Sequence, residues 1–283
     1  MLTCGFAGFG LIGGSIARSL KRKDKAHIIV QDPDEQVRVL AKKARVADRV
    51  TEKIDASFAD CDIVFLSAPA SHNLFNLRIV MPYLRPDAVL TDVSSVKEPI
   101  HRLSAELGIE SRFVGGHPMC GSEKSGFEAS SARFVTDACY ILTKTEGTDL
   151  SRLARMENFV RTIGARPLIM TAADHDACAG AVSHLPHVAA SALVSLVAKK
   201  DDPAHTMQQI AAGGFKDLTR IASSSPEMWR QILLLNGPKV SALIDDYIAQ
   251  LKDLRKMIDK GDTEAIRAFF EHAKEYREQI QGD

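Results

Sequence analysis

Cysteine is scarce in this sequence, and its spacing is not that of a disulfide framework. Five cysteines occur in 283 residues, with no C-x-x-C pair, and an odd count argues against a set of disulfides. We therefore expect reduced thiols and a cytoplasmic protein. At the N-terminus the apolar residues come before the basic ones, which is the reverse of an export signal.

An excess of charge of either sign is also missing. The 36 Lys and Arg residues balance 36 Asp and Glu, and the sequence pI is about 7.1. Proteins that bind nucleic acid or a membrane surface through basic patches usually carry a positive excess. We therefore expect neither partner. The 45% share of hydrophobic residues predicts an ordinary folded protein with a core.

One uncharged run is long enough to span a bilayer. Residues 177–197 contain no Asp, Glu, Lys or Arg. The run nevertheless holds two histidines, a proline, three serines and many alanines. We predict a helix buried in a core or a subunit interface, and no membrane span.

The first 171 residues alternate short apolar runs with helical patterns such as Leu11–Lys23 and Asp34–Ala44. This alternation predicts an α/β fold, a Rossmann-type doubly wound domain with a mostly parallel sheet. A helix near Leu150–Ile163 precedes the last strand. The predicted strands are Leu2–Ala7, His27–Val30, Ile63–Ala68, Ala88–Val93, Phe113–Gly115, Ala138–Thr143 and Arg166–Met170.

Strand patterns stop at Ala172, and we predict an all-helical second domain over 172–283. Ser225-Pro226-Glu227 offers an N-cap followed by a proline at the first helical position. Two later segments keep the spacing of one apolar helix face. Their apolar positions are Val240, Leu243, Ile244, Tyr247, Ile248, Leu251, Leu254 and Ile258, then Ile266, Phe269, Phe270, Ala273 and Tyr276.

The first helix of this second domain has almost no polar face, and too few other helices are present to cover it. We therefore predict that a second copy of the chain covers it in a homodimer. The alternative is a monomer whose Rossmann domain packs over the helix.

Gly8-Phe9-Gly10-Leu11-Ile12-Gly13 is a G-x-G-x-x-G motif between a predicted strand and a predicted helix. The glycines suit a tight turn, a close approach of pyrophosphate and close packing of helix on strand. The N–H groups of a helix N-terminus favour phosphate. The motif therefore predicts a dinucleotide site that includes Leu11 and Ile12.

Asp32 ends the next predicted strand, where a carboxylate accepts hydrogen bonds from ribose hydroxyls. It would repel a 2′-phosphate, and no Arg follows it immediately. We therefore predict NAD rather than NADP as the cofactor. Ser67 and Pro69 end a later strand at the same edge, and serve either the cofactor or a plain turn.

Four segments after the glycine motif are rich in side chains that can take part in catalysis or binding. The sequence is similar over nearly its whole length to the prephenate/arogenate dehydrogenase (TyrA) family. The resemblance implies the minimal catalytic form, without a fused chorismate mutase domain. The segments are Thr91-Asp92-Val93-Ser94-Ser95-Val96-Lys97, Gly115-Gly116-His117-Pro118-Met119-Cys120-Gly121-Ser122-Glu123-Lys124-Ser125-Gly126, Ser183-His184-Leu185-Pro186-His187 and Gly213-Gly214-Phe215-Lys216-Asp217-Leu218-Thr219-Arg220-Ile221-Ala222.

The resemblance implies NAD-dependent oxidative decarboxylation of prephenate to 4-hydroxyphenylpyruvate, in tyrosine biosynthesis. Arogenate as the substrate, with tyrosine as the direct product, stays open, because Glu123 favours an ammonium group and Lys124 a keto acid. A non-catalytic NAD-binding module is a further alternative. It would have no reason to keep His117, Ser95 and Arg220 together.

The resemblance implies a role for each candidate residue. His117 deprotonates the substrate hydroxyl, so activity should rise with pH through its pKa, and Ser95 orients it. Arg220 binds the ring carboxylate, and Lys216 supports it or lies on the surface. The other implied pocket residues are His187, Ser183, Ser122, Glu123 and Trp229, the tryptophan coming across the dimer. We expect no metal site, because the histidine spacing lacks accompanying acidic or cysteine ligands.

Overall fold

The computed structural model describes residues 1–23, 26–122 and 124–280. The chain divides into two compact units, Met1–Gly237 and Pro238–Asp283. Each unit is described by itself below.

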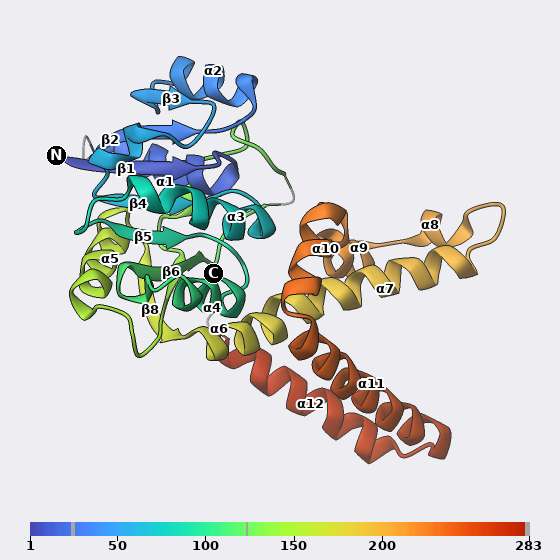
Figure 1. The fold of residues 1–283 in the computed structure, drawn as a ribbon. Helices are drawn as coiled ribbons and strands as arrows, with labels where there is room; N and C mark the ends of the chain where they lie inside the picture. Colours follow the sequence, from blue (N-terminus) through green and yellow to red (C-terminus); the bar gives the residue numbers. More distant parts are fainter. Residues whose placement is uncertain (24–25, 123, 281–283) are drawn as a thin grey trace. The chain divides into compact units, whose positions relative to one another are not determined.

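The first unit contains one eight-stranded sheet (Figure 1). The strand order is β3-β2-β1-β4-β5-β6-β7-β8. All neighbouring strands are parallel except β6 and β7, which are antiparallel. The strands are β1 (Leu2–Ala7), β2 (Ala26–Gln31), β3 (Arg49–Thr51), β4 (Ile63–Leu66), β5 (Val89–Asp92), β6 (Phe113–Pro118), β7 (Cys139–Lys144) and β8 (Arg166–Thr171).

Helices cover both faces of this sheet, as a doubly wound fold requires. One core cluster joins the sheet to α1 (Leu11–Arg22), α2 (Glu35–Lys43) and α5 (Leu150–Thr162). The other joins it to α3 (Ala70–Val80) and α4 (Glu98–Glu106). Successive residues of β4 alternate between the two clusters, because side chains of a strand point to opposite faces. Short one-turn segments complete the unit, namely η1 (Ala56–Asp60), η2 (Met81–Tyr83), η3 (Glu110–Arg112) and η4 (Ala132–Phe134).

The seven predicted strands are confirmed, with ends that differ by a few residues. The short β3 has no apolar run and was not predicted. The antiparallel direction of β7 was not predicted either, because apolar runs read alike in both directions. β7 is reached through the irregular segment after β6, and not through a crossover helix.

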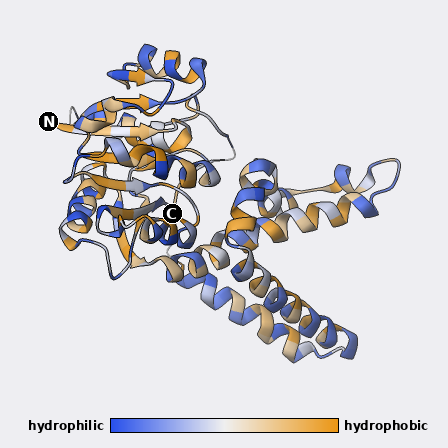
Figure 2. Ribbon diagram, in the orientation of Figure 1, coloured by the Kyte–Doolittle hydropathy of each residue, from blue (hydrophilic) through white to orange (hydrophobic). Residues whose placement is uncertain are grey.

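A long helix begins directly after β8. It consists of α6 (Ala172–Ala179), one π-helical turn at Gly180–His184, and α7 (Leu185–Lys200). By length and composition it is the one helix of the described residues that is able to cross a membrane. α7 is rich in apolar residues (Figure 2), yet only its Ala190 is buried.

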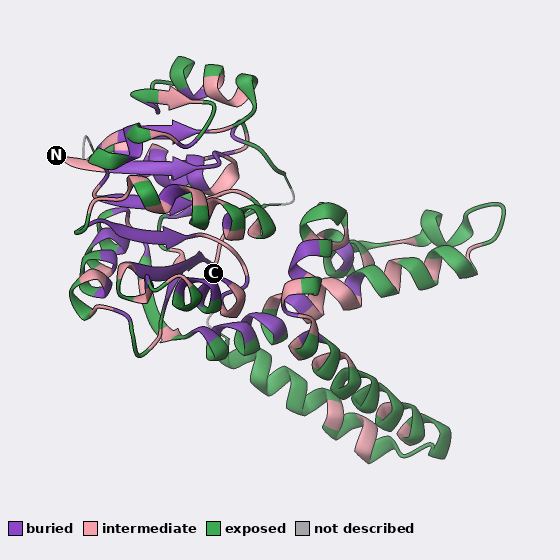
Figure 3. Cartoon of the chain, in the orientation of Figure 1, coloured by how far each residue is buried: buried purple, intermediate pink, exposed green. Residues whose placement is uncertain are grey.

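The alternative of a monomer whose Rossmann-type part packs over this helix is therefore wrong within the first unit. Its apolar surface is left open within the first unit (Figure 3). The remaining helices of the unit are α8 (Thr206–Ile210), α9 (Gly213–Thr219), the 3-10 turn η6 (Arg220–Ser223) and α10 (Pro226–Leu235). The predicted cap is confirmed, since the Ser225 side chain accepts from Met228 N.

The second unit holds most of α11 (Gly237–Lys260) and all of α12 (Thr263–Gln279). The two helices are joined by Gly261, whose φ of +63° suits glycine. Several predicted face residues are exposed in the single chain: Tyr247, Ile248, Leu251, Ile258, Phe270 and Tyr276. The domain boundary at 171/172 stays a prediction, because the division into compact units falls later, at 237/238.

Candidate active site

The turn between β1 and α1 is shaped by its glycines. Gly8 has φ +83°, and a Cβ there would lie 2.6 Å from Ala68 N. A Cβ on Gly13 would lie 2.7 Å from Ser67 Oγ. A Cβ on Gly10 would meet nothing within 4 Å, so this glycine faces open space. The turn thus leaves room for a group that approaches the backbone, as a pyrophosphate would.

The start of α1 offers the N–H groups that such a group needs. Among the described residues no side chain caps this end, and Gly10 serves as its N-cap. Leu11 and Ile12 form its first turn, where N–H groups have no partner within the helix. These features suit a dinucleotide phosphate.

Asp32 closes the site at the end of β2. Its Oδ2 accepts from Phe9 N at 2.8 Å, which ties the carboxylate to the glycine turn. Arg38 Nη1 donates to the carbonyls of Asp32 (2.7 Å) and Pro33 (2.8 Å). Arg38 was not predicted, because it is six residues away along the chain, yet it bonds to the backbone of Asp32.

Ser67 and Pro69 lie at the same edge of the sheet, after β4. Ser67 Oγ donates to Gly8 O at 2.6 Å, and Pro69 is the N-cap residue of α3. Asn73 Nδ2 donates to Leu66 O (3.0 Å) and to Ser94 Oγ (2.9 Å). Asn73, which the sequence analysis did not identify, thereby links the ends of β4 and β5.

A buried ion pair follows β5. Lys97 Nζ contacts Asp92 Oδ2, and both side chains are fully buried. Lys97 Nζ also donates to Gly116 O at 2.7 Å, and Gly116 N donates to Asp92 Oδ1 at 3.2 Å. The pair therefore joins the turn after β5 to the end of β6, where His117 lies. Burial lowers the pKa of Lys97, and the charge of Asp92 opposes this effect.

His117 is buried near the C-terminal end of β6. Its Nδ1 lies 2.8 Å from His175 Nε2, and His175 Nδ1 lies 2.7 Å from Asp176 Oδ1. Burial lowers the pKa of His117 well below its usual range, and nearby His175 and Lys97 act in the same direction. A neutral imidazole is the form that accepts a proton. His175 and Asp176 were not predicted, because they belong to none of the four segments.

The π-helical turn contains Ser183 and His184, and such turns are frequent at functional sites. His184 is buried, and Asn236 Nδ2 lies 3.1 Å from its Nδ1. Burial lowers the pKa of His184 to about 4. His187 Nδ1 lies 2.9 Å from Ser183 O, which fixes its ring at the start of α7.

His187 and Trp229 stack within one chain, with ring centroids 3.9 Å apart and an interplanar angle of 29°. The indole also meets His184 edge-on at 5.9 Å. Burial lowers the pKa of His187, while its bond to Ser183 opposes this and the charge of Arg220 adds to it. Among the described residues, Trp229 Nε1 is a buried polar atom without a hydrogen-bond partner. The cluster thus contains polar groups suited to a bound ligand.

The remaining predicted residues are Ser95, Ser122, Lys216 and Glu123. Ser95 is half-buried in the turn that carries Lys97, while the ring partner of His117 is His175. Ser122 is exposed, with its Oγ accepting from Lys124 N at 3.1 Å. Lys216 is exposed on α9. Glu123 lies outside the described residues.

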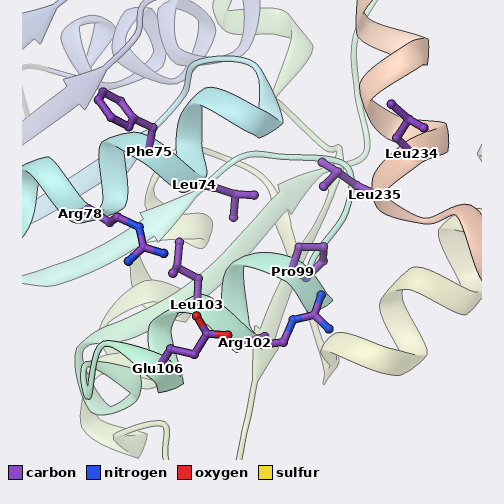
Figure 4. Close-up of a pocket in the computed structure, with 9 residues that line it drawn as sticks. All are labelled: Leu74, Phe75, Arg78, Pro99, Arg102, Leu103, Glu106, Leu234 and Leu235. Atoms are coloured by element: carbon purple, nitrogen blue, oxygen red, sulfur yellow. The ribbon is translucent and has the colours of Figure 1, made fainter.

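A separate pocket of about 520 Å³ lies among α3, α4 and α10 (Figure 4). Its lining combines leucines and Phe75 with two arginines and Glu106. It contains none of the predicted site residues, and it lacks the buried histidines that proton transfer requires. We therefore place the candidate site at the His117 network. In the part of the chain that the structure describes, no group of three His, Cys, Asp or Glu residues is arranged to hold a metal ion.

Comparisons with known proteins show the family of the chain. The family described as "Prephenate dehydrogenase, nucleotide-binding domain" matches residues 16–169, and "Prephenate dehydrogenase, dimerization domain" matches residues 171–274. The chain belongs to the prephenate dehydrogenase family.

The chain is similar to curated proteins of this family. The chain is 34% identical to the prephenate dehydrogenase of Bacillus subtilis, over 96% of this chain and 74% of the relative. It is 31% identical to the cyclohexadienyl dehydrogenase of Zymomonas mobilis, over 98% of this chain and 95% of the relative.

Solved structures of the family share the fold. Aquifex aeolicus prephenate dehydrogenase, in complex with hydroxyphenyl propionate and NAD+, superposes with a TM-score of 0.93 at 34% identity, covering 99% of each chain. Synechocystis arogenate dehydrogenase superposes with a TM-score of 0.86 at 27% identity, covering 99% of this chain and 100% of the other.

The buried pair leads to a prediction on stability. Lys97→Met leaves Asp92 as a buried charge without its cation, and we expect the free energy of unfolding in urea to fall by about 3–5 kcal/mol. Lys21→Met is the control, because Lys21 pairs with Asp48 at 2.6 Å in partly exposed surroundings. We expect that change to cost less than about 1 kcal/mol. Equal losses in the two variants would contradict the prediction.

The neighbourhood of Asp32 leads to a prediction on cofactor choice. Asp32→Asn keeps an acceptor for Phe9 N and removes the charge that repels a 2′-phosphate. Arg38 then lies ready to pair with that phosphate. We expect kcat/KM with NADP, relative to NAD, to rise at least about tenfold, which corresponds to about 1.4 kcal/mol.

The double variant Asp32→Asn/Arg38→Ala is the matched control, and it should lose most of this gain. An unchanged cofactor ratio in the single variant would show that Asp32 does not determine the choice.

Proposed function

We propose that this protein catalyses the NAD-dependent oxidative decarboxylation of prephenate to 4-hydroxyphenylpyruvate, a step of tyrosine biosynthesis. The observation that carries the proposal is the buried, neutral His117, held by His175 at the edge of the sheet where the glycine turn also lies. A base beside a dinucleotide site suits the oxidation of an alcohol.

The chemistry combines three transfers. Hydride leaves the ring carbon that bears the hydroxyl, and the nicotinamide of NAD accepts it when bound. The hydroxyl proton passes to His117. The ring carboxylate leaves as CO2, and the electron pair of its broken C–C bond enters the ring, which becomes aromatic. His117 then returns the proton to the ring oxygen, which gives the hydroxyl of 4-hydroxyphenylpyruvate. His117 must be unprotonated at the start.

Other side chains bind and orient the substrate in this proposal. Arg220 pairs with the ring carboxylate, because a guanidinium offers two parallel donors. Burial lowers the pKa of His187, and the charge of Arg220 acts in the same direction, as expected for two residues that lie near each other. His187 and Trp229 pack against the side-chain end of the substrate, with Ser183 beside them.

Ser95 orients the substrate hydroxyl from the turn after β5, and Ser122, Glu123 and Lys216 contribute to substrate binding. The cofactor rests on Gly8, Gly10, Leu11, Ile12, Gly13 and Asp32, with Ser67 and Pro69 beside the nicotinamide end. These roles extend to this chain what the family resemblance implies.

Arogenate is the second candidate substrate, and the names of two relatives support it. One is a cyclohexadienyl dehydrogenase and another an arogenate dehydrogenase. The two substrates differ by a keto group or an ammonium group on the side chain. Selection therefore depends on charges near that end of the pocket.

We further propose that the chain works as a homodimer in the cytoplasm. The matched family is a dimerisation domain, and in the single chain α7 buries only Ala190 and leaves Leu196 exposed. Burying an apolar face is favourable by roughly 25 cal/mol per Å². In this proposal residues 172–283 form the domain that supplies the dimer interface.

The proposed base is tested by His117→Asn. We expect NADH formation from prephenate to fall by about 10²–10⁴-fold, the usual contribution of a general base, while NAD affinity stays within about twofold. Prephenate and arogenate are assayed side by side. Retained NAD binding with no turnover of either substrate by the unmodified protein would favour a non-catalytic NAD-binding module.

The pH dependence provides the accompanying control. A base with a lowered pKa loses activity only when the pH falls through that pKa, so we expect the acid limb of kcat/KM below pH 6.5. A limb well above that value would assign the base to another group.

The proposed dimer is tested by Leu196→Glu, which places a charge on the open apolar face of α7. We expect light scattering to show a dimer for the unmodified chain and a monomer for the variant. Lys42→Glu is the control, because Lys42 is exposed on α2 of the Rossmann-type part. A monomeric unmodified chain, or a variant that stays dimeric, would contradict the proposal.

A further inference from the structure

A chain of three buried side chains lies behind the proposed base. His117 Nδ1 is 2.8 Å from His175 Nε2, and His175 Nδ1 is 2.7 Å from Asp176 Oδ1. The side chains of His175 and Asp176 are essentially inaccessible to water, and His117 is 8% exposed. A hydrogen bond between two neutral imidazoles requires that one nitrogen donates and the other accepts. The direction of these bonds therefore decides which nitrogen of His117 is free to act as a base.

Asp176 sets that direction. Its Oδ1 accepts from Lys97 N at 2.7 Å, and its Oδ2 accepts from Glu98 N at 2.9 Å, at the start of α4. Burial acts to raise the pKa of Asp176, but the bonds from His175 and from these two N–H groups outweigh it and lower the pKa. An ionised carboxylate only accepts. His175 Nδ1 must therefore carry the hydrogen.

The rest of the chain follows. A neutral His175 with hydrogen on Nδ1 has a lone pair on Nε2, so the hydrogen between the rings belongs to His117 Nδ1. The lone pair of a neutral His117 then lies on Nε2. Burial lowers the pKa of His175, and its bond to Asp176 opposes this. The other charged or titratable groups that act on the two rings are Lys97, Asp92 and His184.

We propose that His175 and Asp176 are positioning residues, which hold His117 in the tautomer with hydrogen on Nδ1 and so make Nε2 the atom that takes the substrate proton. This proposal rests on the function proposed above. In the proton-transfer step the substrate O–H bond breaks and an Nε2–H bond forms, with no change of oxidation state. The resulting imidazolium keeps its Nδ1–H bond to His175, and the charge of Asp176 stabilises it. The Asp of Ser-His-Asp enzymes holds its histidine in the same way.

The test compares two substitutions at one position. The His175→Leu side chain neither accepts nor donates, so both tautomers of His117 become available. We expect kcat to fall by about 10–100-fold, which is less than the loss expected when the base itself is removed. His175→Gln has a carbonyl to accept from His117 and an amide to donate to Asp176. We expect it to restore kcat to within about fivefold. Neither change should alter NAD affinity.

His101→Leu is the matched control for the loss of a buried imidazole. His101 is also buried, and its Nε2 bonds to Thr143 Oγ1 at 2.7 Å, outside the hydrogen-bonded chain behind His117. We expect this variant to lose stability and to keep the pH profile of kcat/KM. A drop in kcat for His101→Leu as large as that for His175→Leu would assign the effect to stability alone.

A readout that does not depend on turnover is the ¹⁵N spectrum of the histidine rings in the NAD-bound protein at pH 8. We expect hydrogen on Nδ1 of His117 in the unmodified protein and in His175→Gln, and a mixture of tautomers in His175→Leu. Hydrogen on Nε2 in the unmodified protein would overturn the proposal. So would a His175→Leu variant that keeps its kcat and pH profile.

Failure of the proposed function gives a different result. The unmodified protein would then turn over neither prephenate nor arogenate, while the ring spectrum would still report the tautomer of His117.

Discussion

The carboxylates of Asp92 and Asp176 are both removed from water, and such a charge is tolerated only when donors surround it. Asp92 takes its donors from Lys97 Nζ, Ser94 N and Gly116 N. Asp176 takes its own from the backbone at the start of α4 and from His175. The two carboxylates thereby join the turn after β5, the end of β6 and helix α6, and the position of His117 depends on all three.

The direction of the sheet places this network beside the cofactor turn. β1, β4, β5 and β6 are parallel, so their carboxyl ends meet at one edge, where ligands of such sheets bind. Ser67 and Asn73 link the turns that follow neighbouring strands. A stacked pair, Phe9 and Phe127, connects the glycine turn to the segment after His117 at a centroid distance of 5.1 Å. The glycine turn and the segment after His117 are therefore in direct contact.

The helical part obeys a different constraint. Its apolar stripes exceed what the single chain buries, since α7 has one buried residue, α11 has one and α12 has none. Exposed apolar surface of this extent marks an interaction site, and the match to a dimerisation domain gives the kind of partner. In this interpretation the substrate pocket and the subunit interface are built from the same long helix, because His184 and His187 lie where it changes from π-helical to α-helical.

The sequence by itself determined the features that depend on neighbouring residues. Strand β1, the glycine turn, Asp32 at the end of β2, the Ser225 cap and the apolar stripes of α11 and α12 follow from spacing and from local backbone chemistry. Only the tertiary structure decided the antiparallel direction of β7, the π-helical turn and the contact of His117 with His175, 58 residues later. Such contacts depend on hydrogen bonds between buried polar side chains that are far apart in the sequence, and no local periodicity in the sequence encodes them.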